Sequence, residues 1–131
     1  MTDRPHLSLV TADELPGPHR VVAFRGALDV ATAETFKTAL AQQADEPITD
    51  LIVDLRGVTF ADSTALSILL NATRRRVTAG RFLVTVCSPG PVLRLMELSA
   101  LTQTLNVVDS IAAAHAKIAS SEAGPFRPAG S

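Results

Sequence analysis

The residues best placed to do chemistry are Asp62, Ser63 and Thr64, which follow an apolar, strand-like run and open an amphipathic helix. A hydroxyl there lies at a helix N-terminus, where backbone N–H groups lack intrahelical partners and the helix dipole favours negative charge. A phosphate added to such a hydroxyl would change the charge of a surface without dismantling the fold. The segment therefore predicts a phosphorylation-switched binding site and not a catalytic one.

Each of these three residues also has a purely structural interpretation. Serine or aspartate before an apolar helix often acts only as an N-cap, worth about 1 kcal/mol. Asp62 either caps the helix, orients the Ser63 hydroxyl or contacts a kinase. Thr64 is either a second phosphoacceptor or an ordinary first-turn residue. Spacing alone leaves these alternatives open.

A second motif, Gly26-Ala27-Leu28-Asp29, ends another apolar run. Asp29 is the expected N-cap of the helix that follows, and it is also a candidate contact for a basic group on a partner. Both motifs lie where a strand gives way to a helix. Because the carboxyl ends of parallel strands share one edge of a sheet, we expect Asp29 and Ser63 on the same edge.

The elements that position these motifs alternate between strand and helix. Their order predicts an α/β fold with an open mixed, mostly parallel sheet of about five strands and about four helices. The strand at 51–55 is apolar on both faces except for Asp54, which fits a central strand holding a buried structural carboxylate. The expected strands are 7–10, 21–24, 51–55, 82–86 and 105–108, and the expected helices begin at Asp29, Ser63, Pro91 and Asp109.

Helical periodicity assigns the buried faces of the longer helices. Gly80 is placed to cap the helix from Ser63, and the cluster 74–76, three arginines, is expected to solvate the end of that helix. Asp109 is the predicted N-cap of the last helix. The predicted inward residues are Leu66, Leu69, Leu70, Thr73 and Val77 in the helix from Ser63, and Ile111, Ala114, His115 and Ile118 in the last helix.

Composition and charge narrow the function classes. The 131 residues are 47% hydrophobic, with 12 Lys+Arg against 13 Asp+Glu and a net charge of −1. This excludes wholesale disorder and gives no basic stripe for nucleic acid. No uninterrupted apolar run reaches the roughly 18 residues of a membrane span, and the first residues have no signal-peptide core. We therefore expect a cytoplasmic protein that binds neither nucleic acid nor membrane.

Known catalytic and metal-binding patterns are missing from the sequence. The three histidines, His6, His19 and His115, are far apart and none has metal-ligand spacing. There is no nucleophile elbow, Walker lysine or dinucleotide-binding glycine loop. The lone Cys87 is expected to be a buried, inert thiol. The prediction is a non-enzyme with no metal and no cofactor.

The two motifs together resemble those of the STAS domain family, and within it the bacterial anti-sigma factor antagonists. Gly26-Ala-Leu-Asp29 resembles the family's Gly-x-Leu-Asp opening of its first helix. Asp54-Leu-Arg-Gly-Val-Thr-Phe-Ala-Asp-Ser-Thr-Ala-Leu66 resembles its Asp-Leu…Val…Phe-x-Asp-Ser-[Ser/Thr]-Gly-Leu segment. The element order matches from about residue 7 to residue 118. The predicted domains are a STAS domain over 1–119 and a disordered tail over 120–131.

This resemblance implies partner switching. Such proteins bind an anti-sigma factor that is also a serine kinase, and thereby release a sigma factor. The kinase uses ATP and magnesium to phosphorylate the serine after the motif's aspartate, here Ser63, and a metal-dependent Ser/Thr phosphatase removes the phosphate. The implied partner-binding residues are Asp29, Asp62, Ser63, Thr64 and Ala65.

One residue departs from the family pattern. Many antagonists have glycine two residues after the phosphorylated serine, whereas this chain has Ala65, whose methyl is expected where a partner's backbone comes close. Ala65 favours an alternative, an unphosphorylated STAS module in a transport or stress-sensing complex. A small-ligand or nucleotide binder is a third hypothesis, which no sequence feature recommends. The sequence leaves both monomer and homodimer open.

Overall fold

The computed structural model describes residues 18–42 and 48–123. Within these residues four strands and four α-helices alternate, as the sequence predicts, and the strand expected at 7–10 lies outside them. The order is β1 (Arg20–Leu28), the 3-10 helix η1 (Val30–Thr32), α1 (Ala33–Gln42), β2 (Leu51–Ala61), α2 (Ser63–Thr78), β3 (Leu83–Val86), α3 (Pro91–Leu98), β4 (Val107–Val108) and α4 (Ile111–Ala123).

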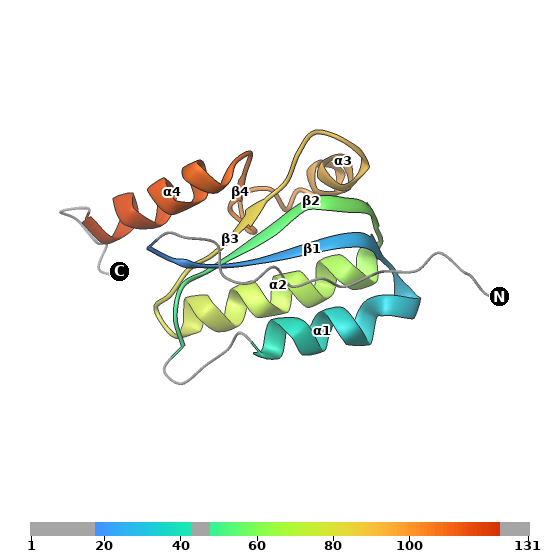
Figure 1. Ribbon diagram of the computed structural model, residues 1–131, viewed down its shortest axis with the longest axis horizontal. Helices are drawn as coiled ribbons and strands as arrows, with labels where there is room; N and C mark the ends of the chain where they lie inside the picture. The colour runs from blue at the N-terminus through green and yellow to red at the C-terminus, as the bar shows by residue number, and fades with distance from the viewer. Residues whose placement is uncertain (1–17, 43–47, 124–131) are drawn as a thin grey trace.

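The described strands form one sheet in the order β1-β2-β3-β4, and every pair is parallel. Helices α1 and α2 contact each other on one face of this sheet, and α4 covers the other face (Figure 1). Parallel pairing requires each chain crossover to carry the next strand back to the same end, which the intervening helices provide. The α/β fold with a parallel sheet is therefore confirmed.

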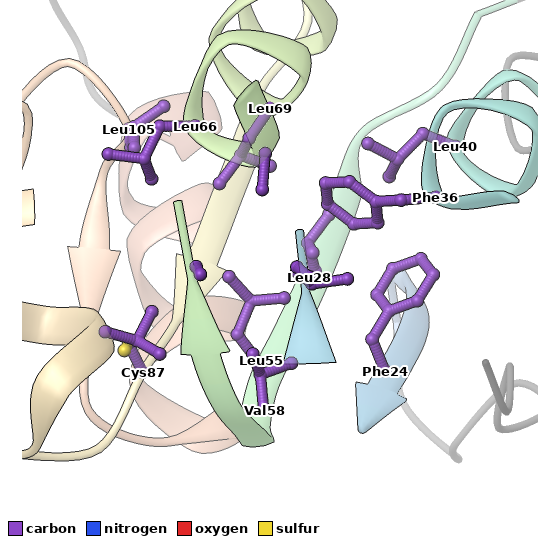
Figure 2. Close-up of a cluster of buried hydrophobic side chains, with 14 of the residues drawn as sticks. Phe24, Leu28, Phe36, Leu40, Leu55, Val58, Leu66, Leu69, Cys87 and Leu105 are labelled. Carbon is purple, nitrogen blue, oxygen red and sulfur yellow. The ribbon is translucent and has the colours of Figure 1, made fainter. Parts of the chain in front are cut away.

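Two hydrophobic clusters hold the layers together. The larger lies between the sheet and the helices α1, α2 and α3, where Phe24 and Phe36 meet edge to face (Figure 2). The smaller joins the sheet to α4. Leu51 and Val53 of β2 belong to the first cluster and Ile52 to the second. Strand β2 is thus buried on both faces, as its continuous apolar sequence predicts.

Strands β1 and β2 are longer than their apolar cores suggest. The register shifts between Ala23 and Arg25, and again between Gly26 and Ala27, and each shift adds a residue to β2. Such bulges bend a strand and increase its twist. After both bulges Leu28 pairs with Ala61, so the two strands end side by side at the edge that carries the predicted motifs.

The C-terminal half of α2 differs from the prediction. Val77 is 62% exposed, whereas Arg76 is only 2% exposed and its Nε donates a hydrogen bond to the carbonyl of Thr49 at 3.2 Å. Arg76 therefore does not solvate the helix end with its two neighbours. Gly80 follows the helix with φ +76°, the left-handed conformation expected of a C-terminal glycine.

Helix α4 has a different N-cap from the one predicted. The Ser110 hydroxyl, and not Asp109, accepts the hydrogen bond from the Ala113 amide at 3.0 Å, so Ser110 is the N-cap. The predicted inward residues Ala114 and Ile118 are fully buried. The helix continues to Ala123, beyond the domain end predicted at residue 119.

Candidate functional site

The turn between β2 and α2 is built around Asp62. Its backbone is extended, with φ −114° and ψ −176°, and its amide donates to the Leu28 carbonyl at 3.1 Å, which ties it to the end of β1. Its side chain accepts from the Ala65 amide at 3.1 Å, and its carbonyl accepts from Leu66 at 3.1 Å. Asp62 is therefore the N-cap of α2, and the structural alternative predicted for it is confirmed.

Ser63 is the first residue of α2, and it is exposed. Because Asp62 supplies the cap, the helix needs nothing from the Ser63 hydroxyl, which takes part in none of the hydrogen bonds among the described residues. Thr64 is exposed as well. Both hydroxyls therefore lie on the surface, at the positive end of a helix of 16 residues.

Ala65 has a different environment from its two neighbours. It is 2% exposed and belongs to the larger hydrophobic cluster. Its methyl faces the interior, where it contributes to packing, and not the surface that a partner would meet. The steric obstacle expected from this methyl is therefore absent.

Asp29 lies at the same edge of the sheet as Asp62. It caps η1 through a capping box: its carboxylate accepts from the Thr32 amide at 3.1 Å, and its own amide donates to the Thr32 hydroxyl at 3.0 Å. Since β1 and β2 pair up to Leu28 and Ala61, the loops that follow them are neighbours at the right-hand end of the sheet in Figure 1. The structure therefore brings the two predicted motifs together.

Two exposed apolar side chains lie beside these loops. Val30, directly after Asp29, is 74% exposed, and Phe60, two residues before Asp62, is 49% exposed. Sequence reasoning missed both. The exposure of Val30 could have been predicted from the sequence, because Val30 follows a cap residue and precedes the inward face of α1. The exposure of Phe60 depends on the bulges in β2, which strand alternation does not reveal.

Two further reactive side chains, Cys87 and Asp54, are buried. Cys87 is buried, and burial together with the negative charge of Asp54 raises the pKa of its thiol, which keeps it protonated. The buried Asp54 accepts from the backbone and guanidinium of Arg56 at 2.9–3.0 Å, as expected of a structural carboxylate. No group of three or more metal-ligating side chains occurs in the described part of the chain.

The structure also contains a contact between two histidines that the sequence analysis did not predict. The Nδ1 atoms of His19, before β1, and His115, in α4, are 3.1 Å apart and the two rings stack. The Nε2 atom of His115 is buried and has no hydrogen-bond partner among the described residues. Burial, and then the charge of His19, lower the pKa of His115. This pair joins α4 to the sheet and lies far in sequence from the acceptor turn.

The family-model comparison identifies the class of protein. The STAS domain model matches residues 10–114, so the chain belongs to the STAS domain family. No curated protein matches the sequence significantly. No helix in the described ranges is both long and apolar enough to cross a membrane.

Solved structures with the same fold include anti-sigma factor antagonists and an anion transporter. An anti-sigma factor antagonist from Mycobacterium paratuberculosis is 22% identical, with a TM-score of 0.76 over 86% of this chain and 95% of that one. The antagonist SpoIIAA in its unphosphorylated form is 16% identical, with a TM-score of 0.57 over 87% and 96%. The murine anion transporter Slc26a9 is 18% identical, with a TM-score of 0.68 over 91% of this chain and 23% of that one. Identities this low show a shared fold.

Proposed function

We propose that this STAS domain is a cytoplasmic anti-sigma factor antagonist. In its unphosphorylated form it binds an anti-sigma factor that is also a serine kinase, and so releases a sigma factor. Phosphorylation at Ser63 switches this binding off, and a Ser/Thr phosphatase restores it. The chain supplies the binding surface and the acceptor, and the kinase supplies ATP, magnesium and the catalytic groups.

The observation that carries the proposal is the division of roles between Asp62 and Ser63. A serine that served as the helix cap would have its hydroxyl occupied, whereas here Asp62 accepts the capping hydrogen bond. The Ser63 hydroxyl is left exposed at the surface edge where two loops meet. Likeness to antagonists over 86% or more of this chain supports the same interpretation.

The proposed switch acts through charge. A phosphate adds about −1.5 to −2 charges at neutral pH. On Ser63 it would stand next to Asp62, on the edge of the sheet that also carries the exposed apolar side chains of Val30 and Phe60. A partner surface that fits a neutral hydroxyl and apolar side chains would bind less tightly, because the added charge must be desolvated and is repelled. Phosphorylation should therefore release the partner and leave the domain folded.

The test is intact-mass analysis with site mapping of the protein isolated from its native cells, before and after phosphatase treatment. We expect a phosphate on Ser63 that phosphatase removes and that is absent from Ser63→Ala. Ser63→Asp should weaken binding to the kinase at least tenfold, and Ser63→Ala should bind constitutively. Ser63→Asp that binds as tightly as the parent protein would overturn the switch.

A second candidate is an unphosphorylated STAS module within a transport complex. The observation in its favour is the likeness of this fold to part of the murine anion transporter. This candidate predicts that the protein co-purifies with a transporter, carries no phosphate under growth, starvation or stress, and behaves identically in Ser63→Ala. The burial of Ala65 removes the sequence argument for it, because that methyl does not reach the surface.

A further inference from the structure

A groove of about 620 Å³ is lined by α1 and α2, and most of its lining residues are exposed. Its α2 wall is one continuous helical stripe that begins at Thr64 and ends at Thr78. At 1.5 Å rise per residue this wall is about 21 Å long. The groove therefore begins at the turn that carries Ser63 and leads away from it along the helix.

The groove has an apolar floor and basic walls. Leu40 and Ala41 of α1 face Ile68 and Ala72 of α2 along the floor.

The exposed basic residues of the walls are Lys37 from α1 and Arg74 and Arg75 from α2, and the buried Arg76 also lines the groove. None of the described residues that line the groove is acidic. This local positive charge contrasts with the whole chain, whose net charge is −1. An anionic occupant would be attracted to this face and not to the protein in general.

We propose that the groove docks an acidic, amphipathic segment of the partner kinase; this inference rests on the proposed function. The apolar side of the segment covers the floor, and its carboxylates pair with Lys37, Arg74 and Arg75. The wall is long enough for about four turns of helix, so that the mode is a helix in a groove. Docking there holds the kinase with its active site at the Ser63 end.

A protein segment fits this groove better than a nucleic acid does. No aromatic side chain among the described residues lines it, so these residues offer no platform on which bases would stack. The apolar floor between the cations matches the alternating apolar and acidic rows of an amphipathic helix. Ser67 and Asn71, midway along α2, add hydrogen-bonding groups to the wall.

The test uses the full chain and the purified kinase that phosphorylates it. Binding is measured at low and high salt for the parent, for Arg74→Glu/Arg75→Glu and for Arg94→Glu. Arg94 is an exposed arginine of α3, outside the groove, and its reversal changes the net charge half as much as the double variant does. Circular dichroism confirms that each variant folds. We expect Kd to rise at least tenfold for the double variant, to lose much of its salt dependence, and to stay within twofold for Arg94→Glu.

The Ser63→Asp variant separates this inference from the proposed function. If Ser63→Asp weakens binding while the double arginine variant stays within twofold of the parent, the groove inference is overturned and the proposed function stands. A loss of binding free energy in Arg94→Glu at least half as large as that in the double variant would mean a general charge effect, which also overturns it. If Ser63→Asp binds like the parent, the proposed function itself fails.

Discussion

At the residue scale, the molecule assigns separate roles to two neighbours that the sequence leaves interchangeable. Aspartate and serine are both good N-caps, so composition alone does not say which one caps α2. The backbone decides: Asp62 is extended and Ser63 is the first helical residue. A cap residue has a non-helical backbone, which allows its side chain to accept a hydrogen bond from an amide of the first helical turn. Of the two residues, only Asp62 has such a backbone.

This division predicts different stabilities for two alanine variants. Asp62→Ala removes the acceptor of the Ala65 amide and should lower the free energy of unfolding by about 1 kcal/mol. Ser63→Ala removes a hydroxyl that has no hydrogen-bond partner among the described residues, and should change the free energy of unfolding by less than about 0.5 kcal/mol. Urea denaturation measures both, with Asp62→Asn as a control that keeps a capping oxygen. A larger loss in Ser63→Ala would show that the serine has a structural role.

A second prediction concerns Thr85 in the middle of β3. Its hydroxyl is fully buried and has no hydrogen-bond partner within the described ranges, and an unpaired buried polar group costs roughly 1–3 kcal/mol. Thr85→Val keeps the shape and removes this cost, so the free energy of unfolding should rise by about 1 kcal/mol. The matched control is Thr73→Val, because the buried Thr73 hydroxyl donates to the Leu69 carbonyl at 2.9 Å. A gain in the control, or a loss in Thr85→Val, would contradict the argument.

At the element scale, the apolar patterns predicted the order and type of the described elements. Leu66 and Leu69 turned inward as the periodicity of α2 predicts, but at the end of that helix Arg76 is buried and Val77 exposed. A long arginine reaches a backbone carbonyl, here that of Thr49, from a position that an apolar pattern assigns to solvent. Hydropathy carries no information about such a partner 27 residues away.

The edge that carries the site was also only partly predictable. The alternation of parallel strands and helices predicted that Asp29 and Ser63 share this edge. It did not predict the bulges of β2, because these depend on contacts between strands: at Gly57 a Cβ atom would lie 2.9 Å from the Cβ of Arg25. These bulges set the exposure of Phe60, so the apolar part of the candidate site appeared only in three dimensions.

Helix α4 depends on a contact that titrates. His115 stacks on His19, and the lowered pKa of His115 means that the folded state resists its protonation. Below the ordinary histidine value of about 6.5 the unfolded state therefore binds more protons than the folded state. Stability is fully present above that value and is lost as the pH falls through it toward the folded pKa.

We expect the free energy of unfolding to be lower at about pH 5.5 than at about pH 7.5, because protonation of His115 puts a positive charge at a partly buried site, 3.1 Å from His19. His115→Leu removes the titrating group and should flatten this dependence. Urea denaturation at both pH values provides the measurement, and circular dichroism confirms that the variant folds. An unchanged pH dependence in His115→Leu would assign the effect to other groups.

At the scale of the whole molecule, the site and the core are separated. The ends of β1 and β2 and the turns that follow them place Asp29, Val30, Phe60 and Ser63 on one edge, while the apolar clusters lie behind them on both faces of the sheet. The side chains of this edge that face solvent contribute little to packing. A charge added there should therefore change what the protein binds and leave its structure intact.

The last prediction concerns the stability of the protein phosphorylated at Ser63, which depends on two opposed electrostatic effects. The N-terminus of α2 favours the phosphate by about 0.3–1 kcal/mol, whereas the neighbouring Asp62 carboxylate repels it. The free energy of unfolding should therefore stay within about 1 kcal/mol of the unmodified value. NMR shifts should change only near the start of α2 and the loop after β1. Ser63→Ala treated with the same kinase is the control. A loss above about 2 kcal/mol, or shifts across α4, would mean that the phosphate disrupts the fold itself.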